Sequence, residues 1–343
     1  MIELMPVKPV HPLHGLVVAA HSPFHADGSL NLAAVEKQAA HFLKHNLTTV
    51  FVAGTTGECD SLTFEERRAL AQRWSEVMRG TALKLVFQVG SNCLEDCRLF
   101  AAQAQAIGAS AISAFAPSYF KPPNLDTLVA WCAGIASAAP GIPFYFYDIP
   151  RLTGVSFPML DFLAQGSTCI PTLAGLKFTN PDLMAYQFVL RADNGQWDVP
   201  FGLDELLLGA LAMGARGAVG SGFNFAAPIY TRLLRAFSAG DLAPAREEQF
   251  RGAQLVHTLG DFGYLGAAKA LMEILGVRVG PARLPNTNPT AEQKTALRGK
   301  LDAMGFFEWI AKPSTNSSQF DPATGANSEN RSTQPGDTAR SRC

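Results

Sequence analysis

One charged side chain interrupts an apolar, uncharged stretch of the sequence. Lys177 is the only charged residue between Phe162 and Pro181, and it lies in a run, Leu173 to Thr179, that is typical of a buried strand. Burial of an ammonium is costly, and a lowered pKa that leaves a neutral, nucleophilic amine is the usual relief. Lys177 is therefore the candidate nucleophile for Schiff-base chemistry with a ketone. The alternative is a structural lysine whose stem is buried while its ammonium reaches water or a carboxylate.

Two threonines follow the second predicted strand in a glycine-rich turn. Thr55 and Thr56 lie between Gly54 and Gly57, and Glu58 ends the turn. The exposed backbone N–H groups and the two hydroxyls suit a bound carboxylate. An ordinary strand-to-helix turn, in which the threonine hydroxyls cap the next helix, is the alternative interpretation.

A tyrosine lies near the end of the fifth predicted strand. Tyr147 is suited to moving a proton beside a Schiff base, and its alternative role is a core aromatic whose hydroxyl bonds a backbone carbonyl. Tyr145 is predicted to share its face of the strand. In the sixth strand Thr179 shares a face with Lys177, so its hydroxyl is expected just above the amine.

The seventh and eighth predicted strands end in small and acidic residues. These are Gly202, Asp204, Glu205 and Ser221. Carboxylates and a hydroxyl at these positions suit a polyhydroxylated substrate, because they accept and donate hydrogen bonds. Capping of the following helix is the alternative role for Asp204.

Short β-branched or aromatic runs alternate with stretches of helical periodicity from Gly15 to Gly222. Eight strands are predicted, at residues 15–21, 49–54, 83–90, 111–117, 142–149, 173–179, 197–202 and 217–222. Amphipathic helices lie between them, and one begins with a capping-box pattern at Thr63 and Glu66. This order predicts an α/β fold, a (β/α)8 TIM barrel with a C-terminal helical extension. An open doubly wound sheet is the alternative, although no GxGxxG or P-loop element follows a strand.

Three segments are expected along the chain. Residues 10–240 are predicted to form the barrel catalytic domain, residues 241–312 a helical extension packed on the barrel, and residues 313–343 a disordered tail. The helices of the extension are predicted at 245–259, 267–275 and 291–310. The tail is rich in Ser, Thr, Asn, Gly and Pro, with Phe320 as its only large apolar side chain, so it cannot bury enough surface to order itself.

Composition excludes several classes of function. The 343 residues are 48% hydrophobic and 17% charged, with a formal net charge of -1 and a pI near 6.7. This gives no electrostatic basis for binding nucleic acid or an anionic membrane surface. Six cysteines are scattered without paired CxxC spacing, which indicates reduced thiols. Because no signal-peptide pattern and no membrane-length apolar stretch are found, a cytoplasmic location is expected.

Five motifs at the predicted strand ends resemble the signature set of the dihydrodipicolinate synthase and N-acetylneuraminate lyase superfamily. They are Gly54-Thr-Thr-Gly-Glu58, Tyr147-Asp-Ile-Pro150, Gly175-Leu-Lys-Phe-Thr179, Gly202-Leu-Asp-Glu205 and Gly220-Ser-Gly-Phe-Asn224. The resemblance covers approximately Gly15 to Pro285. It implies that Lys177 forms a Schiff base with pyruvate or another 2-oxo acid.

The same resemblance assigns further roles. Tyr147 matches the tyrosine that shuttles protons, and Thr55 and Thr56 match the residues that hold the substrate carboxylate. Neither a metal nor an organic cofactor is implied. The implied partners are a small sugar acid, pyruvate and further copies of the chain, commonly in a tetramer, with no role for nucleic acid or a membrane.

The lyase branch of the superfamily is favoured by two sets of positions. Synthase-type members carry an arginine where this chain has Leu152, which cannot bind a second carboxylate. Five residues match the positions with which lyases hold the hydroxylated chain of sialic acid, namely Thr179, Gly202, Asp204, Glu205 and Ser221. The segments 144–154, 119–122 and 281–285 are most similar to animal N-acetylneuraminate lyases. Gly222 and Phe223 depart from the Thr-Tyr common after the eighth-strand serine, which leaves the preferred acyl sugar open.

The resemblance therefore implies a class I aldolase that cleaves N-acetylneuraminate to N-acetylmannosamine and pyruvate. One alternative is a related aldolase for another 2-oxo acid, such as 2-keto-3-deoxygluconate or 4-hydroxy-2-oxoglutarate. The other is a catalytically silent barrel that binds sialic acids. Cys59, next to the glycine-rich turn, is expected to be a buried small residue rather than a reactive thiol.

Overall fold

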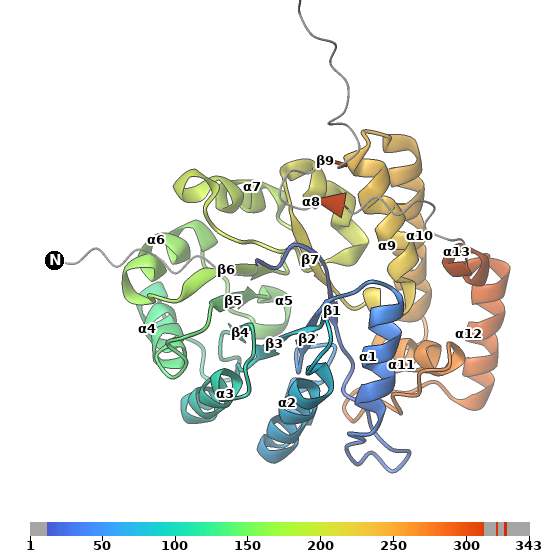
Figure 1. Ribbon diagram of the computed structural model, residues 1–343, viewed down its shortest axis with the longest axis horizontal. Helices are drawn as coiled ribbons and strands as arrows, with labels where there is room; N and C mark the ends of the chain where they lie inside the picture. The colour runs from blue at the N-terminus through green and yellow to red at the C-terminus, as the bar shows by residue number, and fades with distance from the viewer. Residues whose placement is uncertain (1–11, 312–319, 322–325, 328–343) are drawn as a thin grey trace, which may run out of the picture.

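Seven parallel strands form a ring in the computed structural model, which describes residues 12–311, 320–321 and 326–327. Their order is β6-β5-β4-β3-β2-β1-β7, and each neighbouring pair runs in parallel. The strands are β1 (Gly15–Ala19), β2 (Thr49–Val52), β3 (Lys84–Gln88), β4 (Ala111–Phe115), β5 (Phe144–Asp148), β6 (Leu173–Phe178) and β7 (Gly217–Gly220). Helices surround this ring (Figure 1). The predicted TIM barrel is confirmed.

The prediction of a regular seventh strand from Trp197 to Gly202 is wrong. This segment closes the ring between β6 and β7 through isolated bridges, in which Asp198 pairs with Gly175 and Phe201 pairs with both Phe178 and Ala218. Regular pairing stops because Pro200 has no N–H to donate, although its carbonyl accepts a bond from Phe178 N at 3.0 Å. The barrel therefore contains seven regular strands and one irregular segment, which occupies the seventh of eight positions along the chain.

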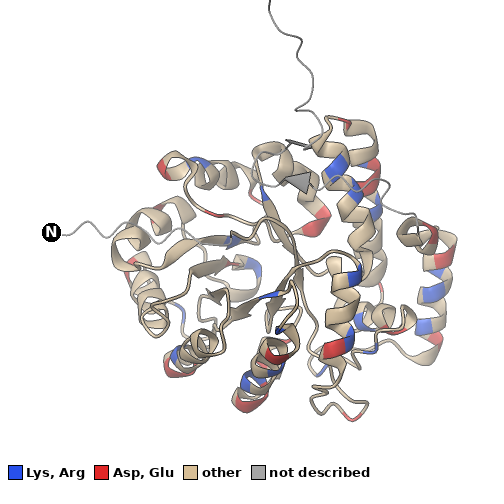
Figure 2. Ribbon diagram, in the orientation of Figure 1, with Lys and Arg blue, Asp and Glu red and all other residues tan. Residues whose placement is uncertain are grey.

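Most helices connect successive strands on the outside of the barrel. They are α1 (Ala34–Lys44), η1 (Cys59–Ser61), α2 (Phe64–Met78), α3 (Leu94–Ala106), α4 (Leu125–Ala136), α5 (Pro150–Thr153), α6 (Met159–Cys169), α7 (Leu183–Arg191), η2 (Ala192–Gly195), η3 (Asp204–Leu206), α8 (Leu207–Met213) and α9 (Phe223–Ser238). The capping box predicted at Thr63 and Glu66 is present at the start of α2. Charged residues are concentrated on the helices rather than on the strands (Figure 2).

Four further helices follow the barrel and gather on the side of α9 (Figure 1). They are α10 (Leu242–Gly260), α11 (Tyr264–Ile274), α12 (Ala291–Ala303) and α13 (Phe306–Ala311). The helix predicted at 291–310 is divided in two, because Gly305 has a left-handed backbone with a φ of 81°. None of the helices in residues 12–311 combines the length and apolar character needed to cross a membrane.

The predicted tail, 313–343, lies almost entirely outside the described residues. Within it the structure describes one short antiparallel pair, β8 (Phe320–Asp321) with β9 (Ala326–Asn327). The division of the chain at residues 240 and 312 stays a prediction.

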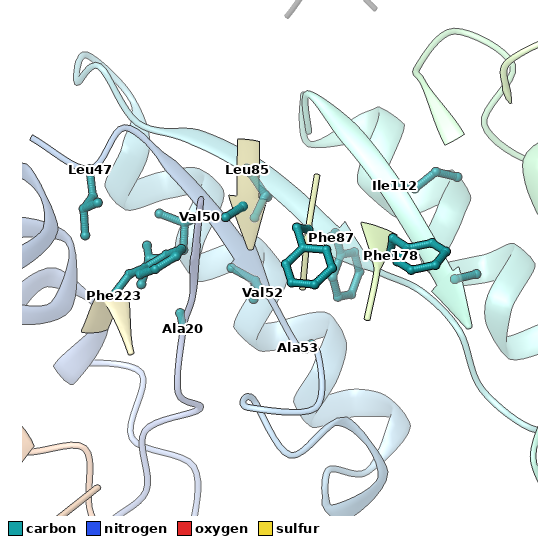
Figure 3. Packing of buried hydrophobic residues seen from close by; sticks show 14 of the residues in the cluster. Ala20, Leu47, Val50, Val52, Ala53, Leu85, Phe87, Ile112, Phe178 and Phe223 are labelled. Atoms are coloured by element: carbon teal, nitrogen blue, oxygen red, sulfur yellow. The ribbon is translucent and has the colours of Figure 1, made fainter. Parts of the chain in front are cut away.

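Alternation along the strands divides the core into two shells. Val50 and Val52 of β2 point outward and pack in the large cluster between strands and helices (Figure 3). Phe51 points the other way and belongs to a smaller cluster inside the barrel, together with Tyr145 and Tyr147. The prediction that the two tyrosines share a face is confirmed.

A buried carboxyl group lies at the N-terminal end of the barrel. Asp198 Oδ2 accepts hydrogen bonds from the Tyr145 hydroxyl at 2.7 Å and from Leu13 N at 2.5 Å. Burial raises the pKa of Asp198, and these donors oppose that shift. Tyr145 and Leu13 are themselves buried, so these side chains fill part of the interior at this end.

Candidate active site

The Lys177 side chain lies inside the barrel. Its Cα is paired with that of Tyr147 on the neighbouring strand β5. The lysine residue is only 4% exposed. Two aromatic rings flank the amine, with Nζ 3.8 Å from the centroid of Tyr147 and 4.0 Å from that of Phe51. The amine is thus held between aromatic faces rather than against a carboxylate.

Burial lowers the pKa of Lys177 from its usual 10.5 to about 7. Cys59 and Asp204 oppose the shift by attraction, but Lys177 forms no ion pair in the described part of the chain. A large fraction of the lysine is therefore a neutral amine near pH 7, which is the form that attacks a carbonyl carbon. This is the electrostatic property that the sequence predicted.

The Tyr147 phenol points to the same place. Its hydroxyl lies 3.2 Å from Thr55 Oγ1, and burial raises the pKa of the phenol to about 12 while the bond from Thr55 opposes this. The phenol is therefore protonated at rest and begins any reaction as a proton donor. Because Thr55 is exposed, this bond connects the buried phenol with the mouth of the barrel.

The turn that carries Thr55 and Thr56 has an unusual backbone. Ala53 and Glu58 each have a φ of 53°, in the left-handed region that residues other than glycine rarely adopt. Such strain persists only where surrounding contacts hold it. Both oxygens of the buried Glu58 carboxylate supply them, since Oε1 accepts from Lys269 Nζ at 2.5 Å and Oε2 from Arg283 N at 2.7 Å.

Thr179 and Gly202 lie against each other at the rim. A Cβ added to Gly202 would come within 1.8 Å of Thr179 Oγ1, so only glycine leaves room for that hydroxyl. Thr179 Oγ1 is buried near the Tyr147 phenol yet makes no well-formed hydrogen bond in the described part of the chain. It is available to a ligand above Lys177.

Asp204 and Glu205, the two acids that follow the irregular segment of the barrel, differ in their contacts. Asp204 Oδ2 accepts from Gly222 N at 2.8 Å and from the Tyr230 hydroxyl at 3.3 Å, and burial raises its pKa. Glu205 is half-buried, and its pKa is raised first by burial and then by Asp204. The Asp204 carboxyl thus binds the loop after β7, whereas no described hydrogen bond restrains the Glu205 carboxyl.

Ser221 contacts a residue that the sequence did not single out. Its Oγ lies 2.6 Å from the hydroxyl of Tyr264, which is supplied by α11. Phe51, which flanks the lysine, was also missed, although strand parity alone could have placed it inside the barrel. No local pattern could have identified Tyr264, because α11 lies far along the sequence.

The structure brings most of the predicted site residues to the C-terminal ends of the strands. Lys177, Tyr147 and Thr55 form one contact group, which Thr179 adjoins. Thr56 is half-buried in the same turn, and Glu205 also borders a cavity on the helix side. Cys59 is buried as expected, and burial raises the pKa of its thiol to about 12. The described residues contain no group of three or more His, Cys, Asp or Glu that could hold a metal.

Residues 12–304 match the dihydrodipicolinate synthetase family. The chain belongs to this family. It is 38% identical to N-acetylneuraminate lyase A of Xenopus laevis over 276 residues, which is 80% of this chain and 90% of that protein.

Solved structures of the family agree with this relationship. The N-acetylneuraminate lyase of Aliivibrio salmonicida has 38% sequence identity and a TM-score of 0.83, covering 87% of this chain and 98% of the other. The Proteus mirabilis N-acetylneuraminate lyase has 36% identity and a TM-score of 0.83, covering 86% of this chain and all of the other, 100%.

Proposed function

We propose that this protein is a class I aldolase that cleaves N-acetylneuraminate to N-acetylmannosamine and pyruvate. The observation that carries the proposal is the Lys177 amine, which is buried between two rings, has a pKa lowered to about 7 and lies opposite Tyr147. The lyases to which the chain is similar support the choice of substrate.

The first half of the proposed reaction forms the Schiff base. Lys177 Nζ attacks the ketone carbon of the 2-oxo acid, while the hydroxyls and N–H groups of the turn containing Thr55 and Thr56 hold the carboxylate. One proton of the attacking amine passes to the carbonyl oxygen, the Tyr147 phenol donates a second proton to it, and the oxygen leaves as water. The products of this step are an iminium cation and a neighbouring phenolate, and each stabilises the charge of the other.

The second half breaks the carbon–carbon bond. The Tyr147 phenolate takes the proton of the hydroxyl on the β carbon, the bond between the α and β carbons breaks, and its electron pair moves toward the iminium nitrogen. The aldehyde sugar is released and an enamine remains. Protonation of the enamine carbon and hydrolysis of the resulting iminium then release pyruvate and the free lysine.

The remaining rim residues hold the hydroxylated chain of the substrate in this proposal. Thr179 offers its free hydroxyl beside the reacting carbons, and Gly202 makes room for it. Asp204, Glu205 and Ser221 offer carboxyl and hydroxyl oxygens to the sugar hydroxyls farther out.

We also infer the setting of the reaction. The protein acts in carbohydrate metabolism in the cytoplasm as a homo-oligomer, a tetramer by resemblance to its family. Light scattering of the purified chain tests the tetramer, and a molar mass near that of a single 36.7 kDa chain would contradict it.

A trapping experiment tests the chemistry directly. The protein is incubated with pyruvate and borohydride, and the reduced adduct is located by peptide mass spectrometry. The adduct is expected on Lys177, and the Lys177→Arg variant is the control that should form none. An adduct on another lysine would refute the mechanism. A panel of 2-oxo acids with coupled pyruvate detection tests the substrate.

A further inference from the structure

A glutamine of the C-terminal helices binds the backbone of the loop that carries the two rim acids. Gln249 lies on α10, and its Nε2 donates to the carbonyls of Glu205 at 2.8 Å and of Asp204 at 3.3 Å. Its Oε1 accepts from Leu208 N at 2.6 Å. One amide side chain therefore binds three backbone groups of the segment from η3 into α8.

These contacts replace a cap that α8 lacks. The first N–H groups of a helix have no partner within the helix, and a polar N-cap side chain usually binds one of them. The N-cap position of α8 is Leu206, which makes no side-chain cap. Leu208 N is among the unpaired donors at the helix start, and Gln249 Oε1 supplies the missing acceptor from another helix.

Packing alone restrains this loop weakly on its outer side. A cavity of about 420 Å³ lies beside this loop, and most of its lining is apolar, including Leu183, Leu206, Phe237 and Leu242. Leu206 itself is 41% exposed. The loop therefore has room to shift outward when the bonds from Gln249 are absent.

The two acids depend on Gln249 to different degrees. The Asp204 carboxyl is also held by Gly222 N and the Tyr230 hydroxyl. No described hydrogen bond holds the Glu205 side chain, so its place at the rim follows from the position of its backbone, which Gln249 binds.

We propose that Gln249 is a positioning residue that sets the rim acids, Glu205 above all, for the hydroxylated chain of the substrate. This role rests on the proposed function, since it concerns the sugar part of N-acetylneuraminate. Loss of Gln249 should impair recognition of the sugar but not Schiff-base formation, because Gln249 contacts neither Lys177 nor the turn that contains Thr55.

The test compares Gln249→Leu with Gln254→Leu, a control on the same helix. Gln249→Leu keeps the approximate size and removes all three bonds. We expect its KM for N-acetylneuraminate to rise about ten- to a hundredfold, while the concentration of pyruvate that gives half-maximal borohydride trapping stays unchanged. Gln254→Leu should change neither quantity. Gln249→Asn, which keeps the amide on a shorter side chain, serves if the leucine variant does not fold, and the same split is expected.

Two results would overturn the role. An unchanged KM in a folded Gln249 variant would do so, and so would an equal loss of pyruvate trapping and sugar-acid binding. Failure of the proposed function looks different, because the wild-type chain would then trap pyruvate without cleaving N-acetylneuraminate. That result would remove both proposals together.

Discussion

Two buried lysines in different regions of the molecule have opposite surroundings. Lys177 lies inside the barrel between two rings and forms no described ion pair. Lys269 lies where α11 meets the barrel, also over a ring, that of Phe24 at 4.2 Å, but its Nζ donates to Glu58 at 2.5 Å and to the carbonyl of Pro281 at 2.8 Å. Burial lowers the pKa of Lys177 to about 7 and that of Lys269 to about 8, and at Lys269 the hydrogen-bonded Glu58 carboxylate opposes the shift.

The comparison shows that burial alone does not make a lysine reactive. A buried ammonium with a carboxylate and a carbonyl as acceptors is a structural charge, and removal of one partner leaves the other unpaired. A buried amine without such partners loses its proton instead and becomes a nucleophile. In this protein Lys269 holds the turn that carries Thr55 through its bond to Glu58. Lys177 is the buried amine without such partners.

Replacement of the reactive lysine should have the largest effect. Lys177→Met is expected to abolish pyruvate trapping and lyase turnover, because it removes the attacking amine beside Tyr147. The same variant should be more stable than the wild type at pH 6, where the folded chain carries a buried charge. Thermal unfolding and activity assays check both results, and a fully active variant would contradict the mechanism.

The stability difference should depend on pH with a definite sign. Since folding lowers the pKa of Lys177 from 10.5 to about 7, the unfolded chain binds more protons between these values. The wild type should therefore gain stability relative to Lys177→Met as the pH rises from about 7 to 10.5. A constant difference across that range would show that the folded lysine keeps an ordinary pKa.

The two tyrosines of β5 offer a matched pair. Tyr147→Phe is expected to lower kcat about 10²- to 10⁴-fold, the usual contribution of a positioned acid or base. Tyr145→Phe removes a hydroxyl two residues earlier on the same face, where it binds Asp198. It should reduce stability while leaving kcat nearly unchanged. Equal losses of kcat in both variants would mean that the phenol at 147 has no special role.

Removal of the structural lysine should act on stability. Lys269→Met leaves Glu58 buried without its partner and is expected to cost about 3–5 kcal/mol of unfolding free energy. Lys300→Met, which breaks the exposed pair with Asp261 at 2.9 Å, should cost far less, because solvent screens an exposed ion pair. Urea unfolding measures both, and similar losses would remove the distinction between buried and exposed pairs.

The rate of adduct formation should depend on the fraction of Lys177 that is neutral. We expect this to be the smallest of the effects predicted here. Below about pH 7 the rate of trapping with pyruvate should fall roughly tenfold per pH unit, since only neutral Lys177 attacks, and it should level off above that pH. Stopped-time borohydride quenching across the range measures this profile. A rate that kept rising to pH 10 would indicate a lysine with its ordinary pKa.

The sequence predicted a special role for Lys177 but not for Lys269, because only Lys177 differs from its neighbours in the sequence. Lys177 is visible locally as a lone charge in an apolar strand. Lys269 is part of a helical pattern, and its partner Glu58 is 211 positions away, so nothing nearby marks it. Tyr264 and Gln249 were hidden in the same way, because their partners Ser221 and Glu205 are 43 and 44 positions away.

Barrel architecture could be predicted because hydrophobic periodicity determines which segments are strands and helices. The irregular seventh position could not be read from periodicity alone, although Pro200 was a warning against regular pairing. The backbone of the turn from Ala53 to Glu58 was equally hidden, since its left-handed residues are not glycines and are held by tertiary contacts.

The buried residues at the N-terminal end of the barrel have a kinetic consequence. Because Asp198, Tyr145 and Leu13 pack at that end, we expect substrate and products to reach and leave Lys177 at the C-terminal ends of the strands. Under the proposed reaction the three-carbon enamine stays bonded to Lys177 inside the barrel, while the sugar aldehyde lies nearer the C-terminal ends of the strands. The aldehyde must go first and pyruvate last, so added pyruvate competes with incoming substrate for the vacant amine.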